Sequence, residues 1–289
     1  MSKDLQTEGP LDQAASSTTC EIDHKFFRLK ESLAAMESLV VAFSGGVDST
    51  FLLRVAKEAL GDKLLAVSAE SETSSRREIE DSRRLAQELG VRRLVIKSED
   101  LKSSEFVKNS PDRCYICKKN RFSAILSLAR SKGFKWVADG SNLDDESDYR
   151  PGMKAVVELG VRSPLMEAGL SKAQIRILSK SRGLSTWDKP AYACLATRIP
   201  YGSPISAEKL AQVDAAEEML RAILGCAQVR VRHFGDAARI EAPVENLAKI
   251  LENNTRLQIV EFFKGLGFRF VTLDLEGYRM GSLNHAQKK

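Results

Sequence analysis

The segment 44–49, which reads SGGVDS, contains residue types that can bind a phosphate group. It lies between a short apolar run and an amphipathic stretch, so it predicts a loop that joins a buried strand to a helix. In such a loop Gly45 and Gly46 let the backbone approach an anion, and the N–H groups at the helix N-terminus converge on it. The hydroxyls of Ser44 and Ser49 add donors. There is no Gly-Lys-Ser, Gly-Lys-Thr or GxGxxG motif, which disfavours a Walker-type NTPase and a dinucleotide fold. A glycine-rich turn that only connects strand to helix is the alternative.

Three cysteines form a second candidate group. Cys114 and Cys117 have the CxxC spacing at a predicted helix start, which lets two thiolates face one metal or cluster, and Cys194 follows much later. A structural zinc normally takes four protein ligands, and none of the three histidines is near these cysteines in sequence. Three thiolates can instead hold a [4Fe–4S] cluster and leave one iron open to a non-protein ligand. Two inert buried helix cysteines are the alternative for the CxxC pair.

The remaining two cysteines, Cys20 and Cys226, have no cysteine neighbour and are expected to be spectators. An odd total of five, without a signal-peptide pattern, predicts no disulfide framework. The sequence therefore favours the reducing cytoplasm.

The SGGVDS segment resembles the pyrophosphate loop (PP-loop) of the N-type ATP pyrophosphatases, which split ATP into AMP and pyrophosphate. This resemblance implies that ATP binds there and that Asp48 helps to hold Mg²⁺, although an Asp in a helix first turn can also be a simple cap. Related enzymes contact adenine and ribose after the second strand, where this chain has Ser71 and Thr73. Gly140 and Asn142 follow the fourth predicted strand at the same edge of the sheet. Either of these two segments could instead be an ordinary turn with a helix cap.

The segment 194–202, CLATRIPYG, closely resembles the LarE family of ATP-dependent sulfur transferases, and the resemblance runs from about Phe26 to Met280. The other segments that carry it are 44–49, 140–145, 230–232 and 238–241. In that family ATP adenylates a carboxylate of pyridinium-3,5-biscarboxylic acid mononucleotide, a sulfur nucleophile displaces AMP, and the step is repeated on the second carboxylate. The products are thiocarboxylates of the nickel-pincer cofactor of lactate racemase.

Two sulfur sources occur in that family. In the sacrificial version a single cysteine, matching Cys194, forms a thioester and loses its sulfur to become dehydroalanine. In the cluster version three cysteines hold [4Fe–4S], whose open iron is thought to carry sulfide. Because this chain has Cys114 and Cys117 as well as Cys194, the resemblance favours the cluster version, with a sulfide donor that the sequence does not identify.

Arginines provide candidate positions for a substrate with carboxylates and a phosphate. Arg230 and Arg232 alternate on a predicted strand, so they share one face and could clamp an oxyanion. Arg198 follows Cys194 by four residues and could reach the same ligand, and Arg279 is a candidate for the substrate phosphate. A solvated surface charge is the alternative for each. Two glutamates, Glu218 and Glu241, are candidates for a metal site or an oligomer surface.

The elements that position these residues follow from the hydrophobic pattern. Short apolar runs alternate with amphipathic stretches up to residue 190, which predicts a parallel α/β sheet with helices on both faces and ligands at the carboxyl ends of the strands. After Pro190 the hydrophobic pattern has no clear period for about ten residues. A capped helix and short strands then predict a smaller α+β domain. The expected division is a disordered tail over 1–21, a PP-loop domain over 22–190, and a substrate, sulfur-transfer and oligomerisation domain over 191–289.

The composition narrows the class of protein. Of 289 residues, 43% are hydrophobic and 29% charged, as in soluble globular proteins, and no apolar run is long enough to cross a membrane. Lys and Arg number 44 against 39 Asp and Glu, an excess of +5 that is too small and interspersed for a dedicated nucleic-acid surface. A tRNA thiolation enzyme and a non-catalytic adenylate-binding module are the alternative functions.

Overall fold

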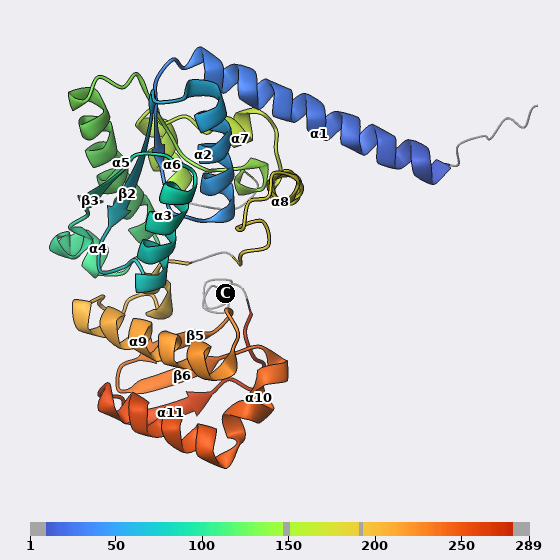
Figure 1. The fold of residues 1–289 in the computed structure, drawn as a ribbon. Helices are drawn as coiled ribbons and strands as arrows, with labels where there is room; N and C mark the ends of the chain where they lie inside the picture. Colours follow the sequence, from blue (N-terminus) through green and yellow to red (C-terminus); the bar gives the residue numbers. More distant parts are fainter. Residues whose placement is uncertain (1–9, 147–150, 191–192, 280–289) are drawn as a thin grey trace, which may run out of the picture.

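The computed structural model describes residues 10–146, 151–190 and 193–279. A four-stranded sheet forms the centre of its N-terminal part (Figure 1). The strands are β1 (Leu39–Ala42), β2 (Leu64–Glu70), β3 (Arg93–Lys97) and β4 (Trp136–Ala138), and they lie in the order β3-β2-β1-β4. All three pairings are parallel, which confirms the predicted parallel sheet.

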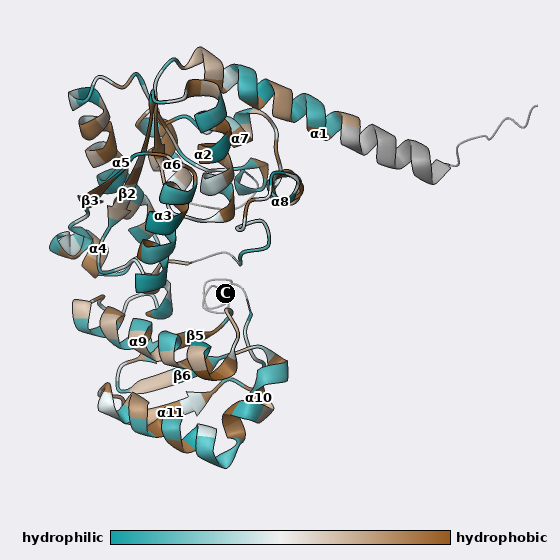
Figure 2. Cartoon of the chain, in the orientation of Figure 1, coloured by the Kyte–Doolittle hydropathy of each residue, from teal (hydrophilic) through white to brown (hydrophobic). Residues whose placement is uncertain are grey.

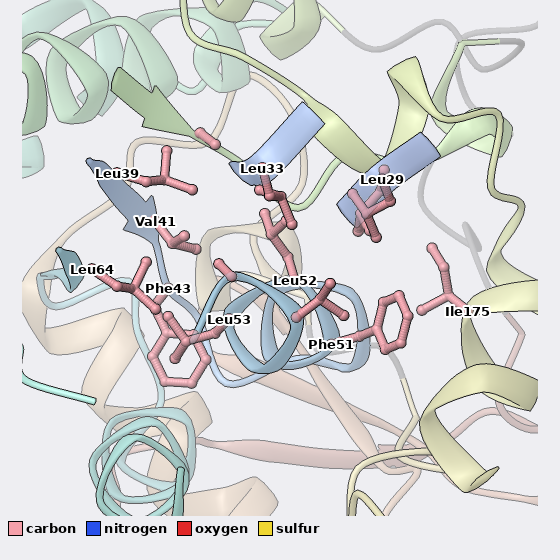
Figure 3. Packing of buried hydrophobic residues seen from close by; sticks show 14 of the residues in the cluster. Leu29, Leu33, Leu39, Val41, Phe43, Phe51, Leu52, Leu53, Leu64 and Ile175 are labelled. Atoms are coloured by element: carbon pink, nitrogen blue, oxygen red, sulfur yellow. The ribbon is translucent and has the colours of Figure 1, made fainter. Parts of the chain in front are cut away.

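Helices cover both faces of this sheet because the side chains of each strand alternate between two apolar cores. On one face, Leu39 and Val41 pack against α1 (Pro10–Ala35), α2 (Val47–Leu60) and α8 (Lys172–Ser181). Figure 3 shows Leu29 and Leu33 from α1 and Phe51 from α2 in this core. On the other face, Val40, Leu65 and Val67 pack against α5 (Arg113–Ser131) and α6 (Pro151–Glu158).

The first helix is longer than the sequence pattern predicted. It begins at Pro10, whereas the pattern predicts a tail up to residue 21 and a helix only from Ile22. Figure 1 shows the N-terminal end of α1 projecting away from the body. The polar composition of 11–21 predicted disorder, but proline suits a first helical turn and no glycine or proline follows it before the packed part begins at Ile22. The helix therefore begins well before the start that the pattern predicts.

A second, three-stranded sheet lies in the C-terminal part and confirms the smaller α+β unit. Its strands, in the order β5-β6-β7, are β5 (Arg230–Phe234), β6 (Ala237–Glu241) and β7 (Phe270–Leu273). The first pair is antiparallel and the second parallel. Around the sheet lie α9 (Ala207–Leu224), α10 (Val244–Leu251) and α11 (Asn253–Gly265), whose teal and brown residues in Figure 2 show amphipathic surfaces.

A further apolar cluster connects the two parts of the chain. It contains Phe106 of α4 (Ser104–Val107), Leu195 of the 3₁₀ helix η3 (Leu195–Arg198), and Leu210 of α9. Two of the predicted functional cysteines, Cys117 and Cys194, pack against this cluster.

The other elements are the helices α3 (Arg76–Glu88) and α7 (Pro164–Glu167), and the 3₁₀ helices η1 (Asp100–Lys102) and η2 (Leu143–Asp145). None of the helices in the described ranges is both long and apolar enough to cross a membrane.

Candidate functional site

A cavity of about 320 Å³ opens at the carboxyl ends of β1 and β2. This is the edge at which open parallel sheets bind ligands. Apolar side chains of the strands and of α5 line one part of it, and polar side chains line the rest. The lining includes Ala42, Ser44, Val67, Glu70, Thr73, Glu78, Ser82, Lys118, Arg121, Phe122, Ile125, Asp139 and Cys194.

The SGGVDS loop forms the connection between β1 and α2 at this cavity. The Ser44 and Ser49 hydroxyls lie 3.1 Å apart, and Gly46, the N-cap of α2, donates its N–H to the Ser44 Oγ at 3.4 Å. Gly45 has a φ of +72°, and a Cβ there would lie 3.0 Å from the Ser82 Cα. The loop therefore needs glycine at residue 45, and it brings backbone N–H groups and hydroxyls together as anion binding requires.

The two predicted residues after β4 have different roles in the structure. A Cβ at Gly140 would lie 2.9 Å from the Ser49 backbone nitrogen, so Gly140 lets the β4 end pack directly on the first turn of α2. Asn142 is buried, and its side-chain oxygen accepts from the Asp144 N–H to cap η2. Asn142 is not among the side chains that line the cavity. The alternative of a turn with a helix cap therefore describes Asn142.

Asp48 presents one carboxylate oxygen without a protein partner. Within the described residues Oδ1 is buried and accepts no hydrogen bond, whereas Oδ2 lies 3.6 Å from the Lys172 Nζ. Burial raises the pKa of Asp48, and the nearby Asp145 charge adds to this effect against the opposing charge of Lys172. A buried carboxylate oxygen with spare acceptor capacity fits a cation such as Mg²⁺.

Two lysines beside this loop were not found from the sequence. Lys172, at the start of α8, faces Asp48, and Lys189 donates to the Gly45 carbonyl at 2.8 Å and pairs with Asp81 at 2.7 Å. Both lie more than a hundred residues after the loop, and no motif in the sequence around them connects them to it. The phosphate loop thus has two cations close to it.

Of the three predicted cysteines, Cys194 lies at the cavity, and Cys117 packs against the same apolar cluster as Cys194. Cys117 lies one turn after Cys114 on α5, while Cys194 precedes η3 and lines the cavity wall. Burial raises the pKa of Cys117 to about 12, and the charges of Asp100, Cys194 and Cys114 contribute in the same direction. Across the described ranges, however, no three His, Cys, Asp or Glu side chains are arranged so that they could hold a metal ion.

The other two cysteines lie on other elements. Cys20 is exposed on α1, and Cys226 follows α9 and packs against the core of the second sheet. All five cysteines are free thiols.

The predicted substrate arginines are buried and already engaged with protein groups. Arg198 makes two hydrogen bonds to Glu217, at 2.7 and 2.9 Å, and Arg232 pairs with Glu241 at 2.7 Å. Arg230 donates to the Val229 carbonyl and lies over the Tyr278 ring. The alternative of solvated surface charges is therefore wrong for these three. Arg279, in contrast, is exposed and pairs with Glu276.

Two neighbouring glutamates on α9 have different surroundings. The Glu218 side chain is 63% exposed and pairs with Arg221, whereas the neighbouring Glu217 is fully buried and binds Arg198, Arg221 and the Val231 N–H. Glu241 is fully buried and holds Arg232 and Arg239. Consequently, in the part of the chain that the structure describes, Glu218 and Glu241 belong to separate ion pairs and to no metal-holding group.

Comparisons with known proteins agree with this geometry. The profile of the NAD synthase family matches residues 22–126, which contain the loop, β1 to β3 and the CxxC pair. The pyridinium-3,5-bisthiocarboxylic acid mononucleotide synthase of Lactiplantibacillus plantarum is 40% identical over 262 residues, or 90% of this chain and 94% of that protein. An uncharacterized protein of Synechocystis sp. is also 40% identical, over 93% of this chain and its own full length.

A more distant relative, an uncharacterized protein of Methanocaldococcus jannaschii, is 30% identical over 88% of this chain and 97% of its own. These matches extend over most of the chain and therefore over both sheets. The chain belongs to the LarE family, the family of the pyridinium-3,5-bisthiocarboxylic acid mononucleotide synthase.

Proposed function

We propose that this protein is an ATP-dependent sulfur transferase that converts the carboxylates of pyridinium-3,5-biscarboxylic acid mononucleotide to thiocarboxylates. One observation carries the proposal: Ser44 of the phosphate loop and Cys194 line the same cavity. A nucleotide activated at the loop would therefore lie within reach of a sulfur-bearing group. The likeness to the L. plantarum synthase supports the choice of substrate.

Different residues around the cavity bind the pyrophosphate, the Mg²⁺ and the adenine during adenylation. The backbone of Gly45 and Gly46 and the two serine hydroxyls bind the pyrophosphate part of ATP, while Lys172 and Lys189 place positive charge beside it. Asp48 holds Mg²⁺, which neutralises phosphate charge when bound. The apolar lining of Ala42, Val67, Phe122 and Ile125 accepts the adenine.

Cys114, Cys117 and Cys194 are proposed to hold a [4Fe–4S] cluster that supplies an open iron site for sulfide. The presence of three thiols, with Cys194 at the cavity and Cys117 close enough to Cys194 and Cys114 to feel their charges, supports this version over the sacrificial one. In either version sulfur enters from Cys194, which lines the same cavity as Ser44.

The test is a direct assay of both products under anaerobic conditions. The full-length protein is incubated with ATP, Mg²⁺, the pyridinium nucleotide and sodium sulfide, and pyrophosphate and the substrate mass are followed. We expect pyrophosphate release that depends on the pyridinium nucleotide, together with replacement of carboxylate oxygen by sulfur. Pyrophosphate release only with tRNA, or none with either substrate, would refute the proposal.

The buried arginines lead to a prediction about substrate affinity. Arg230→Ala and Arg232→Ala should each weaken pyridinium nucleotide binding by roughly ten- to a hundredfold while ATP affinity stays nearly constant, because a charge-assisted hydrogen bond contributes about 1.5–3 kcal/mol. Titration calorimetry with each ligand measures both affinities. Arg239→Ala is the matched control, since it removes the other arginine bound to Glu241. Equal losses for both ligands would indicate a general folding defect instead.

The proposal includes a homo-oligomer formed through the C-terminal part, in the reducing cytoplasm. Large apolar side chains are exposed there, notably Val244, Leu251, Phe270 and Leu275. Exposed apolar side chains of this kind are typical of association surfaces.

A further inference from the structure

Arg121 is a cavity residue close to two of the predicted cysteines. It follows Cys117 by one turn on α5 and lines the cavity together with Cys194. Its Nη2 lies 2.6 Å from the Asp100 Oδ2 and 2.8 Å from the hydroxyls of Ser71 and Thr73. These contacts hold one end of the guanidinium against the loop that follows β2.

Asp100, which binds this arginine, is itself held in place by burial and hydrogen bonds. Asp100 is only 1% exposed and also accepts hydrogen bonds from the hydroxyls of Ser98, at 2.7 Å, and Ser71, at 2.8 Å. Burial would raise the pKa of Asp100, but the charge and hydrogen bond of Arg121 outweigh it and lower that pKa. The carboxylate therefore stays ionised, and the planar guanidinium is fixed in one orientation.

The guanidinium also has a donor, beside Nη2, that no described residue uses. The Nε of Arg121 is buried and has no hydrogen-bond partner among the described residues. Burial alone would lower the pKa of Arg121, but the acidic groups beside it, Cys117 and the ion-paired Asp100, raise it. A buried donor that lacks a partner at the wall of a cavity calls for a ligand acceptor.

We propose that Arg121 is a catalytic residue of the sulfur-transfer step and donates its Nε–H to the phosphate of the acyl-adenylate as AMP departs. This inference rests on the proposed function. In the step, hydrosulfide sulfur forms a bond to the carboxyl carbon, and the bond between that carbon and the phosphate oxygen breaks. AMP leaves with the bonding electron pair, and the hydrosulfide proton passes to solvent.

The geometry favours a directional hydrogen bond over a simple attraction of charge. Because Asp100 neutralises Arg121, the pair adds little net positive charge to the cavity. Asp100 instead orients the Nε–H of Arg121. In the proposed step this N–H lies next to the point where an anionic sulfur approaches an anionic phosphate. A preorganised donor at developing charge acts mainly on the transition state, so it changes the rate of this step more than substrate binding.

The test separates the two half-reactions. Adenylation is measured as substrate-dependent exchange of labelled pyrophosphate into ATP, and sulfur transfer as thiocarboxylate formed in a single turnover with sodium sulfide present. For Arg121→Gln we expect exchange within about threefold of the unmodified protein and a fall in thiocarboxylate formation of roughly a hundredfold or more. Arg121→Lys should recover less than a tenth of the loss, because an ammonium lacks the oriented edge of the guanidinium. Arg130→Gln, near the far end of the same helix, is the matched control.

A second measurement distinguishes loss of the guanidinium group from a folding defect. Guanidinium ion added at millimolar concentration to Arg121→Ala should restore sulfur transfer, which a collapsed site would not permit. Equal loss in both half-reactions without rescue, or unchanged sulfur transfer in Arg121→Gln, would overturn the role of Arg121. Absence of pyrophosphate exchange in the unmodified protein would instead overturn the proposed function on which it rests.

Discussion

Asp48→Ala is expected to reduce ATP-dependent pyrophosphate release by at least roughly a hundredfold. Its Oδ1 is buried beside the phosphate loop and has no hydrogen-bond partner among the residues that the structure describes, and we assign it to Mg²⁺. A cation that neutralises the transferring phosphates contributes several kcal/mol to transition-state stabilisation, so its loss affects the rate strongly. The measurement is pyrophosphate release with saturating ATP and pyridinium nucleotide.

Asp62→Ala is the matched control for this experiment, because Asp62 follows the same helix but is fully exposed and pairs only with Lys57 among the ion pairs described for it. Asp48→Asn, which preserves the shape but removes the charge, should behave like the alanine variant. Release at the normal rate in either Asp48 variant would remove this residue from the mechanism.

Replacing any one of Cys114, Cys117 and Cys194 by serine is expected to remove the visible absorption of anaerobically purified protein and its sulfur transfer together. The reason is the number of ligands: three thiolates bind three irons, and the fourth iron is left for the sulfide that is transferred. Iron and sulfide analysis, the visible spectrum and turnover number per chain provide the measurement. With sulfide supplied, the unmodified protein should complete more than one turnover.

Cys226→Ser and Cys20→Ser are the matched controls and should retain both colour and activity, since Cys20 is exposed on α1 and Cys226 packs against the core of the second sheet. The sacrificial mechanism predicts a different pattern. Cys114 and Cys117 would then be dispensable, activity would stop after one sulfur per chain, and Cys194 would lose the mass of H₂S. That mass loss in an active, iron-free preparation would refute the cluster version.

The sequence was sufficient for the parallel sheet and the phosphate loop. Strand and helix periodicity are local properties, so the apolar run that begins at Leu39, followed by two glycines and an amphipathic stretch, identifies β1, the loop and α2. It also identified the family, because the loop, the cysteines and the segment after Cys194 are short motifs. The pattern assigned no element between residues 143 and 187, where short helices such as α7 have too few turns for a clear period.

Tertiary structure alone decided which charged groups meet. Lys172 and Lys189 approach the phosphate loop from distant positions, and Arg121 reaches Asp100 and the loop after β2 only because α5 packs on that side of the sheet. Glu217 and Glu218 are identical in type and adjacent in sequence, and only the packing of α9 directs the first into the buried arginines and the second to solvent. Residue type and spacing determine what chemistry a side chain can perform. Burial and partner choice depend on long-range packing, which the local pattern does not encode.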